Sequence, residues 1–188
     1  LGLLHMEIVQ ERLEREYNLN LILTVPNVVY RIKKKDGKLI EVDTPAKLPA
    51  STETEEAQEP YVSLLMIIPV DGLDPVCELT KSRRGTFKSS EYLGEDRVKL
   101  IFEIPLSEII VDFYDRMKSM TKGYGSLDYE FKGYLPAKLV KLDILFNGVA
   151  CDAFSSLMHK EKAISKAHAL VAKLKELIPR QMFEVAIQ

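Results

Sequence analysis

Cysteine and histidine are scarce in this 188-residue sequence, which has two of the first and three of the second. Cys77 and Cys151 lie far apart, and neither has a second cysteine or histidine at a metal-binding spacing. This pattern predicts reduced thiols in a cytoplasmic protein, the alternative being a disulfide. The three histidines, His5, His159 and His168, are isolated, which predicts structural or surface roles.

Long apolar runs and an excess of one charge are also absent. No run approaches the roughly 20 apolar residues that span a bilayer, and no basic segment of the signal-peptide type is present. The net charge of −2 gives no overall attraction to nucleic acid, so such binding would need a local basic patch. With 46% hydrophobic and 29% charged residues, the composition predicts a soluble globular protein with a real core.

Motifs for nucleotide binding and acyl transfer are missing as well. The sequence has no GxxxxGK[ST] phosphate loop, and Ser155 and Ser156 do not lie in a GxSxG context. The acidic residues Glu7, Glu11 and Glu14 fall on the polar face of a helix. We therefore expect no enzyme activity, no cofactor and no metal in this chain.

The first 60 residues predict a helix, two strands and an irregular segment. Residues 1–17 are helical in pattern, with an apolar stripe but no capping residue before it, so we expect the sequence to begin inside a larger protein. The stripe consists of Met6, Val9, Leu13 and Tyr17. Residues 19–32 predict a strand bent at Pro26, and Asp36-Gly37 predicts a hairpin turn. Residues 43–60 combine prolines, threonines and acidic residues without periodicity, which predicts a linker or a mobile loop.

A regular alternation of elements begins at Tyr61. Strands are predicted over residues 61–70, 86–92, 97–105 and 126–134. A helix capped by Asp74 follows the first strand, and a helix capped by Ser107 follows the third. The apolar stripe of this second helix consists of Ile109, Ile110, Phe113 and Met117. The order β-α-β-β-α-β from Tyr61 to Tyr134 predicts an α+β fold of the ferredoxin-like, split βαβ type.

The segment Gly123-Tyr124-Gly125 is glycine-rich like a phosphate-binding loop, but it lies at the wrong end of a helix. Phosphate sites use helix N-termini, where free N–H groups and the helix dipole attract anions. Gly123 is expected to be the left-handed residue past a helix C-terminus, and Gly125 to open the last strand. The sequence therefore predicts a turn.

The last 50 residues predict a hairpin and a long helix. Asn147-Gly148 is a strong hairpin signal between two strands. A helix from about Lys160 to Pro179 follows, and residues 181–188 begin another strand. The apolar face of that helix consists of Ala163, Ile164, Ala167, Leu170, Val171, Leu174 and Leu177.

Two groups of basic residues are candidate RNA-binding sites. The first comprises Lys81, Arg83, Arg84 and Lys88, near the end of the first helix of the predicted ferredoxin-like unit. Cations there either complement the helix dipole or contact phosphate groups, and the local sequence leaves both roles open. The second comprises Lys160, Lys162 and Lys166 on the last helix, which form either a solvated face or a contact for a polyanion. The aromatic pattern of an RNA-recognition motif is absent, so RNA binding on the sheet face is disfavoured.

Five segments resemble the LepA, or elongation factor 4, family of translational GTPases and occur in the order found there. They are GLLHMEIVQERLEREY, SRRG, EIPLSEI, SMTKGYGSLDYEF and ELIPRQMFEVAIQ. The first four also resemble segments of elongation factor G, whereas the last is similar to LepA alone. The acidic STETEEAQE segment departs from any pattern of the family.

The resemblance implies a division into parts. Residues 1–42 resemble the remnant of a third domain with a partial ferredoxin-like fold, and residues 43–58 a linker. Residues 59–135 resemble the ferredoxin-like domain of elongation factor G, and residues 136–188 the first part of the α/β C-terminal domain specific to LepA.

The resemblance also implies a function for the whole protein. It would hydrolyse GTP with magnesium on the elongating ribosome, act in back-translocation or translation fidelity, and contact ribosomal RNA and tRNA. The family match of SRRG favours RNA contact by the first basic group. A cytoplasmic location, with peripheral association at the inner face of the cell membrane, is part of this expectation. The alternative is a free-standing ferredoxin-like regulatory or dimerisation module that binds a small ligand, and a scaffold without RNA affinity is a second.

Overall fold

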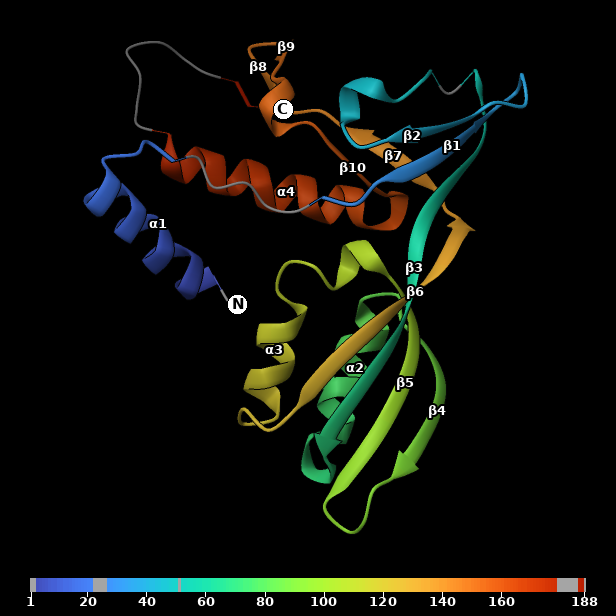
Figure 1. Cartoon of the computed structure of the whole chain (residues 1–188). Coiled ribbons are helices and arrows are strands. Elements are labelled where there is room, and N and C mark those ends of the chain that lie inside the picture. Colours follow the sequence, from blue (N-terminus) through green and yellow to red (C-terminus); the bar gives the residue numbers. More distant parts are fainter. Residues whose placement is uncertain (1–2, 22–26, 51, 179–185, 188) are drawn as a thin grey trace. The chain divides into compact units, whose positions relative to one another are not determined.

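The computed structural model describes the chain except for residues 1–2, 22–26, 51, 179–185 and 188 (Figure 1). It is a mixed α and β structure with antiparallel sheets. The chain forms two compact units, each made of two segments. Unit 1 comprises residues 1–28 and 61–132, and unit 2 comprises residues 29–60 and 133–188.

Unit 1 contains the predicted β-α-β-β-α-β order of elements. These are β3 (Thr54–Pro69, of which residues 61–69 belong here), α2 (Leu73–Ser82), β4 (Thr86–Tyr92), β5 (Arg97–Pro105), α3 (Phe113–Met120) and β6 (Ser126–Pro136). The strands lie side by side in the order β6-β3-β5-β4. The β3–β5 pair is antiparallel and unbroken, from Tyr61 opposite Pro105 to Pro69 opposite Arg97.

One face of this sheet carries the core. Alternate residues of β3 and β5 are fully or almost fully buried, because α2 and α3 cover that face (Figure 1). The core side chains are Val62, Leu64, Met66, Ile68, Val76, Leu79, Val98, Leu100, Phe102, Ile104, Ile109, Phe113 and Met117. The period of two in the strands and of three to four in the helices is the pattern from which both kinds of element were predicted.

The helix starts in unit 1 differ from the predicted ones. α2 begins at Leu73 with Gly72 as its N-cap residue, so Asp74 lies inside the first turn instead of capping it. Ser107 lies in a 3₁₀ turn, Leu106–Glu108, and α3 begins only at Phe113. Of the predicted stripe, Ile109, Phe113 and Met117 are buried and Ile110 is half-buried.

Helix α1 (Leu3–Tyr17) is present as predicted, but its apolar stripe is not packed along the part whose side chains are described. Val9 is 55% exposed and Tyr17 is 66% exposed, while Leu13 is half-buried. Helical spacing defines an apolar side, but a neighbouring element is needed to bury it.

The described residues of unit 2 contain two hairpins, a further strand pair and one long helix. Its elements, besides the first residues of β3, are β1 (Tyr30–Lys34), β2 (Leu39–Val42), β7 (Leu139–Leu142), β8 (Leu145–Phe146), β9 (Val149–Ala150), β10 (Ser156–His159) and α4 (Lys160–Leu177), with 3₁₀ turns at Pro45–Lys47 and Asp152–Phe154. Both predicted hairpin turns are confirmed. Gly37 has φ of 81° between β1 and β2, and Asn147 and Gly148 have φ of 50° and 81° between β8 and β9.

The prediction of an irregular linker is wrong from Thr54 onward. Residues 54–58 form the start of β3 and pair with β1. Two ion pairs help to explain why an acidic segment forms a strand here: Lys33 Nζ lies 3.0 Å from Glu55 Oε1, and Lys34 Nζ lies 3.3 Å from Glu53 Oε2. Opposite charges on neighbouring strands stabilise their pairing.

Helix α4 packs less of its predicted apolar face than expected. Leu174 is buried, but Ile164 is 73% exposed and Leu177 is 67% exposed, so these two do not belong to the packed side. The bend at Pro26, the helix stop at Pro179 and most of the predicted last strand lie outside the described residues. Ile187, which is described, forms an isolated bridge with Phe146 of β8.

Candidate nucleic-acid interface

The SRRG segment forms the C-terminal turn of α2. Arg84 takes the left-handed conformation, with φ of 63°, and its N–H donates to the carbonyl of Lys81 at 3.0 Å. The N–H of Gly85 donates to the carbonyl of Thr80 at 2.9 Å, which completes a Schellman motif. A Cβ atom at Gly85 would lie 2.5 Å from Thr80 Cγ2 and 2.7 Å from its carbonyl oxygen. The glycine is therefore required by close contact with the helix end.

Both arginines of this turn are paired with acids of the segment before and at the start of α3. Arg83 Nη2 donates to Asp112 Oδ1 and to Oδ2, each at 2.7 Å, and its Nη1 lies 3.9 Å from Glu108 Oε2. Arg84 Nε donates to Glu108 Oε1 at 3.0 Å. The exposed fractions of the Arg83, Arg84 and Glu108 side chains are only 20%, 16% and 9%. We call Arg83, Arg84, Glu108 and Asp112 the arginine clasp.

The other two predicted residues of the first basic group lie in different surroundings. Lys88 Nζ lies 2.6 Å from Glu103 Oε2, and the same carboxylate also contacts Lys132. Lys81 is exposed in the last turn of α2, and no carboxylate of the described part of the chain lies within ion-pair distance of it. The structure thus does not form one open basic patch from the four residues, and their contact with RNA stays a prediction.

The lysines of α4 are arranged differently. Lys162, Lys166 and Lys173 follow one another at helical spacing along one side of the helix. Lys166 and Lys173 are exposed, and neither has a carboxylate within ion-pair distance among the residues that the structure describes, while Lys162 is half-buried. Lys160 is exposed at the first position of the helix. The sequence predicted Lys160, Lys162 and Lys166 as a group, whereas the place of Lys173 on the same side and the absence of acidic partners within the described residues come from the structure.

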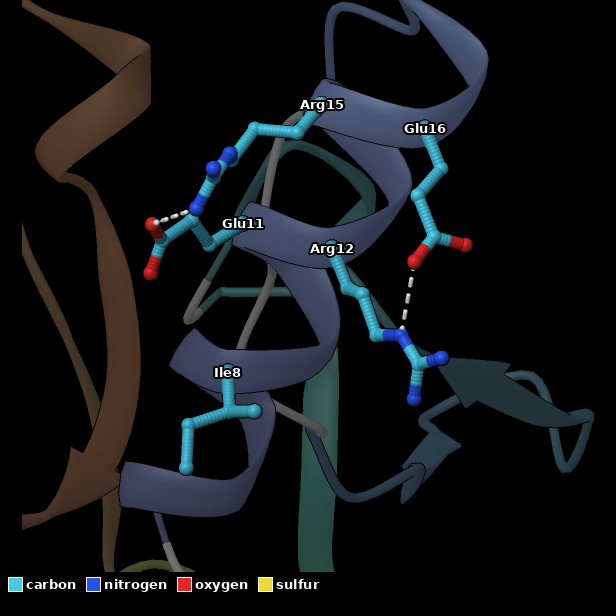
Figure 2. Close-up of a pocket in the computed structure, with 5 residues that line it drawn as sticks. All are labelled: Ile8, Glu11, Arg12, Arg15 and Glu16. Atoms are coloured by element: carbon cyan, nitrogen blue, oxygen red, sulfur yellow. Dashed lines mark hydrogen bonds and ion pairs between the residues drawn. The ribbon is translucent and has the colours of Figure 1, made fainter.

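A pocket lies along α1, and the described residues that line it all belong to that helix (Figure 2). Its charged residues are paired at i,i+4 spacing: Arg12 Nε lies 2.9 Å from Glu16 Oε1, and Arg15 Nη1 lies 3.2 Å from Glu11 Oε1. Ile8 forms the apolar part (Figure 2) and is 53% exposed. Exposed pairs of this kind support a helix weakly and offer no unsatisfied group to a ligand.

The titratable groups give no sign of a catalytic centre in the described segments. Burial raises the pKa of the Cys77 thiol above its usual 9.0, which disfavours the reactive thiolate. The hydrogen bond from Ser155 Oγ to Asp143 Oδ1, at 2.6 Å, is the main cause that lowers the pKa of Asp143. No cluster of metal-ligating side chains is present among the described residues, and none of the described helices is long and apolar enough to cross a membrane.

Two family models match this chain in succession. The model for the elongation factor G C-terminus covers residues 56–145, and the model for the C-terminus of the GTP-binding protein LepA covers residues 146–188. The whole chain is 52% identical to elongation factor 4 of Desulfitobacterium hafniense, 53% identical to that of Clostridium novyi and 51% identical to that of Geobacillus thermodenitrificans. The chain belongs to the LepA, or elongation factor 4, family.

The match to these LepA family relatives covers all 188 residues of this chain and 31% of each relative. Among solved structures, a crystal structure from Thermus thermophilus is 26% identical, with a TM-score of 0.41, over 44% of this chain and 12% of that one. The family identity therefore rests on sequence, and the chain corresponds to the C-terminal region of a translation factor.

Proposed function

We propose that this chain is the ribosome-binding C-terminal region of a translational GTPase that acts during elongation, in back-translocation or in translation fidelity. The match to elongation factor 4, which covers all of this chain and 31% of the relative, supports this proposal. The whole protein would bind GTP and Mg²⁺ elsewhere, because the chain itself lacks a phosphate-loop motif. Its partners would be ribosomal RNA and tRNA, in the cytoplasm. Peripheral membrane association gains no support from the described residues and stays a prediction.

We also infer that residues 59–135 form a ferredoxin-like domain of the elongation factor G type. The strand order β6-β3-β5-β4, with a helix after β3 and a helix after β5, supports this inference. Two βαβ units interleaved in this way are the split βαβ motif. The fold by itself does not specify a function, so the function is argued from charged surfaces.

The lysine side of α4 is the surface that suits a polyanion best. Affinity for nucleic acid comes largely from counterions released when lysine or arginine neutralises phosphate groups. A cation that already has a carboxylate partner, such as Arg83 or Arg84, adds little to this release. Lys166 and Lys173 have no such partner within the described residues. Lys81 of unit 1 likewise has no carboxylate partner among the described residues. These three residues are therefore the proposed phosphate contacts.

Sedimentation of the purified chain with ribosomes, over a series of salt concentrations, tests the proposal. The variant Lys166→Gln/Lys173→Gln is expected to bind more weakly. Each lysine–phosphate pair that it removes makes the negative slope of log affinity against log salt shallower by about 0.7–0.9. The matched control is Lys33→Gln/Lys47→Gln, which removes two lysines that already have acidic partners, Glu55 and Asp43. Equal binding by both variants and the parent at all salt concentrations would refute RNA contact by α4.

A further inference from the structure

The turn that joins α3 to β6 is fixed by hydrogen bonds on both sides. Thr121 is buried, and its Oγ1 donates to the carbonyl of Met117 at 2.8 Å and accepts from the N–H of Gly125 at 2.9 Å. The N–H of Gly123 donates to the carbonyl of Lys118 at 2.8 Å. Lys118 Nζ donates back to the carbonyl of Gly123 at 3.0 Å, so that one lysine closes the turn from its outer side.

The two glycines also fix the path of the backbone. Gly123 has φ of 87°, a conformation that residues with a side chain rarely adopt. A Cβ atom at Gly125 would lie 2.5 Å from Met117 Sδ and 2.7 Å from Thr121 Oγ1, so only glycine fits. The residue between them, Tyr124, therefore lies on a turn whose backbone is held by hydrogen bonds at Gly123 and at Gly125.

The side chain of Tyr124 is not packed against the protein, although the backbone of its turn is held by hydrogen bonds. Its side chain is 79% exposed, and its N–H is the group that the turn uses, donating to the carbonyl of Thr121 at 2.9 Å. Lys118 Nζ also lies 5.6 Å from the centre of the Tyr114 ring, which is 43% exposed. A preorganised turn that presents an aromatic ring to solvent lowers the entropy cost of binding a partner there.

The charge around this ring favours an anionic partner. Between Phe113 and Gly125 the chain has three basic residues, Arg116, Lys118 and Lys122, and one acidic residue, Asp115. Arg116 already has a partner, because its Nη1 lies 3.9 Å from Asp112 Oδ2, which leaves Lys118 and Lys122 as the cations of this turn. Lys122 is exposed and has no carboxylate within ion-pair distance in the described part of the molecule. Aromatic rings beside lysines are the usual surface for unpaired nucleotides, because the base stacks on the ring and the phosphate meets the cation.

We propose that Tyr124, with Lys122 on the same turn and Lys118 bonded to the carbonyl of Gly123, is a stacking site for an unpaired RNA base. This inference rests on the proposed RNA-binding function and specifies a second contact, on unit 1, with a different chemistry from that of α4. The base stacks on the Tyr124 ring, and its phosphate is neutralised by Lys122. Recognition is of single-stranded RNA without marked sequence preference.

Fluorescence anisotropy with a short labelled oligoadenylate tests the site. Tyr124→Ala is expected to weaken binding about 5- to 150-fold, the range that loss of one stacked base gives. Tyr124→Phe keeps the ring and is expected to bind within about twofold of the parent. Tyr92→Ala, which removes another exposed tyrosine of unit 1, is the matched control and is expected to bind as the parent does.

Several results would overturn the stacking site while leaving the proposed function standing. One is sedimentation of the chain with ribosomes but no binding of oligoadenylate. A second is unchanged oligoadenylate binding by Tyr124→Ala. A third is a Tyr124→Ala variant that loses ribosome binding but keeps oligoadenylate binding, which would assign the turn to a ribosomal protein. Failure of the parent chain to bind ribosomes at all would instead remove the proposed function.

Discussion

Removing the charge of Glu108 is expected to destabilise unit 1. Glu108→Gln keeps the shape of the side chain but withdraws the counterion from Arg84, whose Nε lies 3.0 Å from Glu108 Oε1. The two side chains are only 16% and 9% exposed, so water replaces the lost partner poorly. Loss of one partner of a fully buried pair costs about 3–5 kcal/mol, whereas exposed pairs contribute about 0–1 kcal/mol. We expect a loss of about 1–3 kcal/mol for this partly shielded pair.

Urea unfolding followed by circular dichroism measures this loss. With an m value of about 1–3 kcal/mol per molar urea, a loss near the middle of the expected range moves the midpoint by roughly 1 M. Because the two units can unfold separately, hydrogen exchange of the β5 amides should accompany the measurement and report on unit 1 alone. Glu16→Gln on α1, whose partner Arg12 is 75% exposed, is the control and should not move the midpoint measurably.

Comparison of the double variant Arg84→Gln/Glu108→Gln with the two single variants gives the interaction energy between these two side chains, apart from their other contacts. If the clasp acts through this ion pair, the double variant is less destabilised than the sum of the two single variants. A Glu108→Gln variant that unfolds at the midpoint of the parent would refute a stabilising role for the Arg84–Glu108 pair, and it would leave the Schellman turn and the Arg83–Asp112 pair as the restraints on this segment. Additive single losses would mean that each side chain acts through other contacts.

Three further outcomes are expected. Gly85→Ala should lower the melting temperature by about 5–10 °C, because the added methyl group collides with Thr80; an unchanged melting curve would contradict this. Ser155→Ala should be less stable than the parent at neutral pH. The pKa of Asp143 is lowered in the folded chain, so its contribution is present above about pH 4 and is lost as the pH falls through the folded pKa. The difference in unfolding free energy between the parent and Ser155→Ala should therefore become smaller below about pH 4. A difference that stays constant with pH would contradict a role for the Ser155–Asp143 hydrogen bond in lowering the pKa of Asp143. Equilibrium dialysis should find no GTP binding by the chain, and micromolar binding would overturn that expectation.

The sequence predicted those elements whose signals are local. Asn147-Gly148 specifies its hairpin turn because both residues accept positive φ. The alternation of buried and half-buried residues in β5 likewise follows from the sequence, since a strand with one face in the core must alternate. The element order of unit 1 followed from such signals.

Long-range pairing could not be predicted in the same way. From the sequence alone, Arg83 and Arg84 predict a basic patch. Their acidic partners, Asp112 and Glu108, lie 29 and 24 residues further along the chain and are not apparent from the local sequence. The acidic segment near Glu55 predicts a linker from sequence alone. The lysine that pairs with Glu55 lies on another strand and cannot be inferred from the local sequence. Helical periodicity could not show which apolar residues of α1 and α4 find a neighbour, since burial depends on tertiary packing.

The bulge in β4 has a consequence for the behaviour of the protein at high concentration. β4 lies at one end of the described sheet, where an exposed strand can pair with a second chain and start aggregation. Lys88 is the extra residue between Phe87, opposite Phe102, and Ser89, opposite Ile101. A bulge twists the edge and breaks its repeat, and a lysine there discourages pairing with another strand. A shortened β4 without residue 88 would be a straight edge whose only charged side chain is Glu91. The expected result is precipitation at high concentration, with the fold itself retained.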